Sequence, residues 1–166
     1  LPYALAWGRG ERMLGLNVPR QRAVVLVFPD FSVNTAEAYG WLDEWRVHPP
    51  PGAAEPVSVL NPFTLSDWDE ISGVAVNDFQ EVVARRHPAV RSVSHALNEL
   101  GCVISMMSGS GSSMFGISGP GPVAETAVRG ITPASLAQSS LRELDVALRV
   151  VHTATASRVE PVLPIE

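Results

Sequence analysis

The longest uniform hydrophobic pattern is a valine-rich run, Ala23–Phe28, which ends at Pro29. A continuous apolar run of this length, bounded by polar residues and proline, is typical of a strand buried on both faces. Two shorter runs, Val103–Met107 and Ser113–Ile117, are separated by a segment rich in glycine and serine. We therefore expect residues 23–28 to form a central strand and residues 103–117 to form a hairpin.

Helical spacing follows the central strand. Tyr39, Leu42 and Trp45 recur every three residues and give one helix face an aromatic character. Either Asn34 or Thr35 can cap the start of this helix, because both side chains accept hydrogen bonds from backbone N–H groups. A helix with an aromatic face is therefore predicted here.

The strongest helical pattern begins at Asn77, with Gln80 three residues later in the position of a capping box. Pro88 divides this pattern into two helices, since proline is favourable in a first turn and unfavourable in a helix interior. Gly101 is expected to end the second helix.

Weaker patterns complete the chain. Residues 123–129 and 135–143 are expected to be helical, and alternation from Leu144 to Val150 predicts a last strand. Residues 48–62 are rich in proline and predict an irregular surface connection. The fold class expected from these elements is α+β, with helices packed on one face of a mainly antiparallel, ferredoxin-like sheet.

The first residues alternate as a strand would, with Tyr3, Leu5 and Trp7 on one side, up to the turn residues 8–10. The pattern then resumes toward Leu16, which predicts one strand with a bend. Because the chain begins inside this element and without methionine, we expect a fragment, a cleaved product or a numbering that covers only part of a protein.

Composition limits the function classes. The chain has 166 residues, 46% of them hydrophobic, and a formal net charge of -5 with a pI near 5.3. These values predict one globular unit that binds neither nucleic acid nor an anionic membrane. No apolar run is long enough to span a bilayer, and the single cysteine, Cys102, is expected to be a buried thiol. A cytoplasmic location is the expectation.

The common catalytic and metal-binding motifs are missing from the sequence. The histidines are scattered, and no HExxH or paired CxxC spacing predicts a metal site. No serine lies in a G-x-S-x-G elbow between a strand and a helix, and neither a Walker A lysine motif nor a dinucleotide fingerprint is present. The distinctive feature that remains is the segment Ser108, Gly109, Ser110, Gly111 and Ser112, in which small residues can direct backbone N–H groups outward. This loop predicts either an anion cradle or an ordinary hairpin turn.

Three other segments, in a fixed order, give that loop a context. Residues 28–39, Phe-Pro-Asp-Phe-Ser-Val-Asn-Thr-Ala-Glu-Ala-Tyr, resemble a strand-to-helix segment of the diphosphocytidyl-methylerythritol kinases, which belong to the GHMP kinases. Residues 7–12 resemble the family's G-x-G-E strand bend, and residues 77–80 resemble its Asn-Asp helix start. Residues 108–113 would then be the third GHMP motif, a glycine-rich turn beside the phosphoryl-transfer site. The resemblance covers residues 5–117; Asp30 replaces an expected glycine, and residues 119–132 are longer than the family needs.

The resemblance implies roles for particular residues. Tyr39 would stack on the cytosine of the substrate, or else pack in the core with Leu42. Thr35 would bond the substrate, or else cap the helix. Asn77 is expected to cap a helix, and the basic cluster 85–87 is expected to be a solvated helix end, with phosphate contact as the alternative.

The resemblance also implies what this chain lacks. Family members use ATP and Mg2+, with a glycine-rich ATP loop, an aspartate and a lysine in their N-terminal half. No residue of this chain is therefore expected to be catalytic, and its expected partners are the small-molecule substrate and that N-terminal half. Residues 1–22 would end the N-terminal domain, 23–158 would form the C-terminal domain and 159–166 a tail. A kinase for another small alcohol, such as homoserine or mevalonate, and a noncatalytic ferredoxin-like binding module stay as alternatives.

Overall fold

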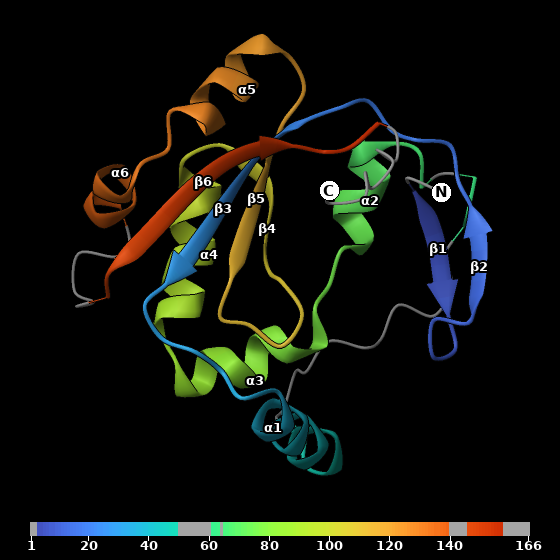
Figure 1. The fold of residues 1–166 in the computed structure, drawn as a ribbon, viewed down its shortest axis with the longest axis vertical. Helices are drawn as coiled ribbons and strands as arrows, with labels where there is room; N and C mark the ends of the chain where they lie inside the picture. The colour runs from blue at the N-terminus through green and yellow to red at the C-terminus, as the bar shows by residue number, and fades with distance from the viewer. Residues whose placement is uncertain (1–2, 50–60, 64, 140–145, 158–166) are drawn as a thin grey trace, which may run out of the picture. The chain divides into compact units, whose positions relative to one another are not determined.

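The computed structural model describes residues 3–49, 61–63, 65–139 and 146–157, and it divides into two compact units. The first comprises Leu1–Gln21, Val57–Val74 and Thr155–Glu166, and the second comprises Arg22–Pro56 and Ala75–Ala154. Figure 1 shows the helices and strands of both units with their labels. No helix among the described residues is both long enough and apolar enough to cross a bilayer.

In the first unit, β1 (Ala4–Trp7) and β2 (Arg12–Gly15) pair as an antiparallel hairpin. The expectation of a single bent strand is wrong, because two glycines with positive φ, Gly8 at 73° and Gly10 at 92°, reverse the chain between them. The same unit contains α2 (Trp68–Val74), which the proline-rich pattern before it did not predict. The phenol of Tyr3 donates to the carbonyl of Leu65 at 2.7 Å, and burial raises the pKa of that phenol.

The second unit is built on a four-stranded sheet in the order β4-β5-β3-β6, in which all pairs are antiparallel. Its strands are β3 (Ala23–Pro29), β4 (Cys102–Met107), β5 (Met114–Ser118) and β6 (Leu148–Ala154). The predicted central strand is confirmed, since β3 lies between β5 and β6 and its Val25 and Val27 are fully buried. The predicted hairpin is confirmed as β4 and β5.

The described residues of this second unit form five helices: α1 (Thr35–Val47), α3 (Asp78–Arg86), α4 (Ala89–Glu99), α5 (Pro122–Arg129) and α6 (Pro133–Gln138). The split of the long helical pattern near Pro88 is confirmed, and Gly101, with φ of 96°, follows the end of α4 as expected. Residues 140–143 of the predicted helix 135–143 and residues 144–145 of the predicted strand 144–150 lie outside the described residues. The predicted start of that strand is wrong in its described part, because Val146 and Ala147 are not in a strand and β6 begins at Leu148.

Strand register shows which sheet face the helices cover. Val25 pairs with Gly116 and with His152, and Gly116 pairs with Ser105, so these four side-chain positions share one face. On that face Ser105 bonds to Ser94 of α4, and the ring of His152 bonds to the carbonyl of Ile131 just after α5. Helix α4 and the segment after α5 therefore pack on the same face of the sheet, and the α+β expectation is confirmed.

Candidate functional site

The glycine-serine loop 108–112 is the turn between β4 and β5. The N–H of Ser108 donates to the carbonyl of Ser113 at 2.8 Å, and the N–H of Gly111 donates to the carbonyl of Ser108 at 3.1 Å. Gly109 and Gly111 have φ values of 56° and 88°, which L side chains rarely adopt. The two glycines therefore allow the chain to close the hairpin within a few residues.

Glycine is also required at position 111 because the side chain of Met107 lies close to it. A Cβ atom at this position would lie 2.5 Å from the sulfur of Met107, a side chain that is buried on β4. The loop therefore lies directly on the core at this point, and its backbone position is tied to Met107.

The loop presents backbone donors. Within the described part of the chain, the N–H groups of Gly109, Ser110 and Ser112 make no hydrogen bond. Backbone N–H groups in a turn of glycine and serine can bind phosphate or carboxylate oxygens without a cationic side chain. This arrangement is compatible with the predicted anion cradle.

The start of α1 contacts the loop. Asn34 caps the helix, because its Oδ1 accepts from the N–H groups of Ala36 and Glu37 at 2.9 and 3.2 Å. Thr35 is consequently not the cap, and its Oγ1 lies 3.0 Å from the Oγ of Ser110. The hydroxyl of Ser112 donates to the carbonyl of Phe31, in the segment that leads into α1. The structure therefore places Thr35 beside the loop, and a single binding site could contain both.

The start of α3 contacts the same loop. Asn77 caps α3, as predicted, with its Oδ1 accepting from the N–H of Phe79 at 2.9 Å. Its Nδ2 donates to the carbonyl oxygens of Met107 and Gly109 at 2.7 and 2.8 Å. The capping-box expectation for Gln80 is wrong, because its Oε1 accepts from the N–H of Met107 at 2.7 Å and not from the cap residue. Sequence reasoning missed both contacts with the loop.

Tyr39 lies on α1 four residues after Thr35, so the two side chains share one helix face. Its side chain is 54% exposed, and its ring meets Phe79 of α3 edge to face with centroids 4.9 Å apart. The alternative of core packing with Leu42 does not describe Tyr39, since Leu42 is buried and Tyr39 is not. An exposed, laterally supported ring of this kind can stack on a planar ligand.

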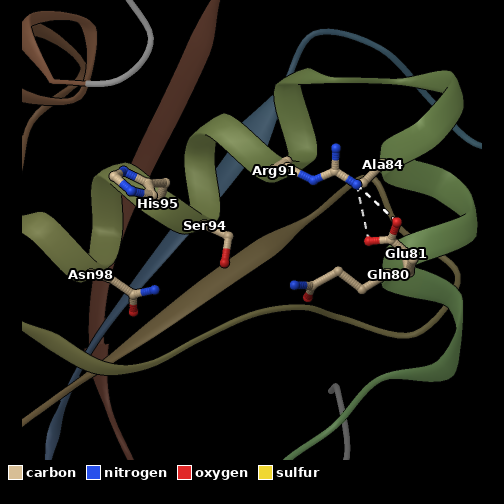
Figure 2. A pocket seen from close by; sticks show the side chains of 7 residues that line it. All are labelled: Gln80, Glu81, Ala84, Arg91, Ser94, His95 and Asn98. Atoms are coloured by element: carbon tan, nitrogen blue, oxygen red, sulfur yellow. Dashed lines mark hydrogen bonds and ion pairs between the residues drawn. The ribbon is translucent and has the colours of Figure 1, made fainter. Parts of the chain in front are cut away.

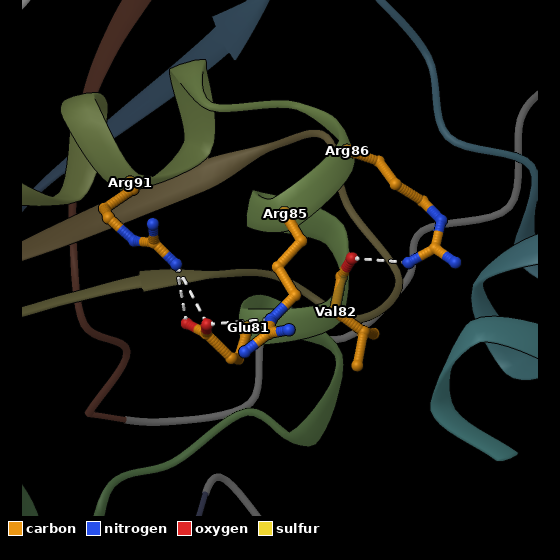
Figure 3. Close-up of polar contacts among 5 residues, drawn as sticks. All are labelled: Glu81, Val82, Arg85, Arg86 and Arg91. Carbon is orange, nitrogen blue, oxygen red and sulfur yellow. Dashed lines mark hydrogen bonds and ion pairs between the residues drawn. The ribbon is translucent and has the colours of Figure 1, made fainter. Parts of the chain in front are cut away.

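The basic cluster 85–87, at the C-terminal end of α3, contacts other side chains of the protein. Arg85 lies over the ring of Trp45, and Arg86 lies over the ring of Trp41 and pairs with Glu44 at 3.1 Å. His87 stacks on Phe31 with ring centroids 4.6 Å apart. In Figure 3 Glu81 lies between Arg85 and Arg91, and Arg86 points away from them toward the carbonyl of Val82. These contacts give the cluster a structural role in joining α1 to α3.

A small hollow of about 170 Å3 lies between α3 and α4, with Gln80 in its wall (Figure 2). Its lining side chains are polar except for Ala84, and Arg91 forms two bonds of 2.9 and 3.0 Å with Glu81. No group of three or more metal-ligating side chains occurs in the part of the chain that the structure describes.

Comparison with known proteins supports the resemblance. Residues 63–137 match the family described as GHMP kinases C terminal. The chain is 31% identical over 112 residues to 4-diphosphocytidyl-2-C-methyl-D-erythritol kinase of Clostridium kluyveri, covering 68% of this chain and 39% of the relative. It is 36% identical over 114 residues to the enzyme of the same name from Geobacter sp., covering 69% of this chain and 38% of the relative. The match thus spans about two fifths of the length of these curated relatives.

Solved structures show the same fold. Homoserine kinase from Cytophaga hutchinsonii superposes with a TM-score of 0.60 at 16% identity, over 88% of this chain and 46% of that chain. A 4-(cytidine 5'-diphospho)-2C-methyl-D-erythritol kinase superposes with a TM-score of 0.54 at 23% identity, over 91% of this chain and 48% of that chain. Residues 63–137 therefore match the C-terminal domain of the GHMP kinases, in agreement with the resemblance found in the motifs.

Proposed function

We propose that this chain is the C-terminal part of an ATP-dependent kinase that phosphorylates the 2-hydroxyl of 4-diphosphocytidyl-2-C-methyl-D-erythritol, in the non-mevalonate route to isoprenoids. The acceptor oxygen attacks the γ-phosphorus, the bond to the β-γ bridging oxygen breaks, and ADP leaves. The names of the relatives, the contact of Thr35 with Ser110 of loop 108–112, and the exposed ring of Tyr39 one turn further along α1 support this proposal.

The residues of this chain would bind and orient, and they would not exchange the acceptor proton. Loop 108–112 would hold phosphate oxygens through backbone N–H groups, and the positive ends of α1 and α3 beside it favour negative charge. Tyr39 would support the cytosine ring by stacking, and Thr35 would bond a polar group of the substrate. ATP and Mg2+ would supply the phosphoryl group and neutralise its charge. Residues 1–22 are proposed as the end of the N-terminal domain, and 23–158 as the C-terminal domain.

The single observation that favours this acceptor over another small alcohol is the exposed ring of Tyr39 on the helix face that carries Thr35. The test is ATP consumption by the full-length parent protein with three acceptors: diphosphocytidyl-methylerythritol, homoserine and mevalonate. We expect turnover with the first alone, and an increase in its KM of about tenfold in Tyr39→Ala but not in Tyr39→Phe, which keeps the ring. Turnover with homoserine or mevalonate instead would move the protein to another kinase class. Turnover with none of the three would favour a noncatalytic binding module.

A further inference from the structure

The first turn of α3 reaches the glycine-serine loop with two side chains, and both bond to the backbone of Met107. Gln80 accepts from the N–H of Met107 at 2.7 Å, and Asn77 donates to its carbonyl oxygen at 2.7 Å. Asn77 also donates to the carbonyl of Gly109 at 2.8 Å, inside the loop. The last residue of β4 and the start of the loop are thus attached to α3 by three hydrogen bonds.

The sheet order explains why side chains are needed at this position. Strand β4 is at the edge of the sheet, with β5 as its partner. Met107 is opposite Met114, and the next pair is joined by the bond from the N–H of Ser108 to the carbonyl of Ser113. In an antiparallel ladder bonded and non-bonded pairs alternate, so both backbone groups of Met107 point away from β5. Asn77 and Gln80 therefore take the place of a neighbouring strand.

Met107 transmits this attachment to the rest of the loop. Its side chain is buried, and its sulfur lies 2.5 Å from the position that a Cβ atom of Gly111 would take. Backbone displacement at Met107 would consequently move the contact with Gly111, which lies in the sequence between Ser110 and Ser112, whose N–H groups make no hydrogen bond among the described residues. The shape of the donor array depends on where α3 holds Met107.

We propose that Asn77 and Gln80 are positioning residues that hold loop 108–112 in its anion-binding shape. This inference rests on the proposed function for its consequence in catalysis, but its structural part does not depend on the substrate. Neither side chain is assigned a contact with ligand. Their effect is to fix backbone donors in advance, which lowers the ordering cost when a phosphate group binds.

Four variants of the full-length parent protein separate this role from helix stability. Gln80→Met removes the acceptor at nearly equal length, whereas Gln80→Glu keeps a carboxylate oxygen for the N–H of Met107. Asn77→Asp keeps the oxygen that caps α3 but replaces the donor with an oxygen that faces two carbonyl groups. Glu81→Gln is the matched control, because Glu81 lies on the same helix and bonds to Arg85 and Arg91 and not to the loop.

The measurements are amide hydrogen exchange at residues 107–112, helix content by circular dichroism, and kcat and KM for ATP and for the acceptor. A lost hydrogen bond is worth about 1 kcal/mol, so Gln80→Met and Asn77→Asp should each raise exchange at Met107 by about fivefold to tenfold. We expect kcat/KM to fall by a similar factor, with helix content unchanged. In Gln80→Glu both amide exchange at Met107 and kcat/KM should stay close to the values of the unsubstituted protein, and Glu81→Gln should change neither of these two quantities.

The exchange data test whether α3 holds Met107 and the loop in place, and the kinetic data test whether this attachment matters for catalysis. Unchanged exchange at residues 107–112 in both Gln80→Met and Asn77→Asp would overturn the attachment itself. Raised exchange with unchanged kcat/KM would overturn the positioning role. If the unsubstituted parent turns over none of the acceptors, the proposed function fails, and the exchange data alone then decide whether α3 shapes the loop.

Discussion

Cys102 shows at the residue scale how burial controls chemistry. Burial raises the pKa of its thiol to about 12 from 9.0. Because the thiolate is the nucleophile, we expect native protein at pH 8 to resist iodoacetamide and unfolded protein to react fully.

Stability should also depend on pH: the unfolded thiol ionises near pH 9 while the folded one stays protonated, so the free energy of unfolding falls from there toward pH 12. Cys102→Ala, which has no thiol, should lose this part of the alkaline slope in chemical denaturation; an identical slope would contradict the assignment.

Gly116 faces the same thiol from β5. A Cβ atom there would lie 2.4 Å from the sulfur of Cys102 and 3.1 Å from Val25, in the core of the sheet. We expect Gly116→Ala to lower the free energy of unfolding by about 1–3 kcal/mol through overpacking. Gly40→Ala is the control, since Gly40 lies within α1 with nothing near its Cβ position and should gain about 1 kcal/mol. Urea denaturation measures both, and the Gly116→Ala loss should shrink in a Cys102→Ala background.

The residues of the candidate site were predictable to different degrees. Asn34 and Asn77 are caps because a polar side chain before a periodic stretch has few other roles, and the structure confirms the Asn77 cap and decides for Asn34 over Thr35. The bonds from Asn77 and Gln80 to Met107 were not predictable, because they join positions about 30 residues apart whose proximity depends on the packing of α3 beside β4. Local spacing describes a helix start, and it contains no information about what lies across from that start.

The start of α1 can be tested at the scale of the element. Asn34→Ala removes the acceptor for two backbone N–H groups and should cost about 1 kcal/mol of stability, whereas Asn34→Asp keeps the acceptor and should cost little. Because this turn positions Thr35 beside Ser110, Asn34→Ala should also weaken protection of the loop from amide exchange. Thermal unfolding and exchange measure the two effects. Equal stability of Asn34→Ala and Asn34→Asp would show that the cap contributes nothing.

Strands with a continuous buried apolar pattern were predicted correctly, whereas the boundaries of α6 and β6 were predicted poorly. β3 and the β4–β5 hairpin follow from apolar runs that no other structure can bury. α6 begins at Pro133, two residues before the expected start, because Thr132 caps it in a reciprocal box with Ser135. β6 extends to Ala154 although its last residues are mostly exposed, since pairing with the whole length of β3 determines its extent. Tertiary pairing of this kind leaves no periodic signal.

At the scale of the whole molecule, the order of motifs carried more information than any one motif. A glycine-serine turn alone predicts a hairpin, but the same turn after a capped aromatic helix and an Asn-Asp helix start indicated the family that residues 63–137 match. The fold follows from this order because each motif is attached to one element of the sheet or its helices. The substrate does not follow from it, since kinases named for different substrates superpose on the chain with similar TM-scores.

We expect the groups that perform catalysis to lie outside these 166 residues. The matched region covers 39% of a curated relative, and the resemblance assigns the ATP loop, the aspartate and the lysine to the N-terminal half. We therefore expect a purified species of 17.8 kDa, the mass of these 166 residues, to consume no ATP with diphosphocytidyl-methylerythritol. A longer parent protein, identified by intact mass, should consume it. Turnover by the 17.8 kDa species would mean that residues of this chain perform the acid-base step, and the division of roles proposed above would be wrong.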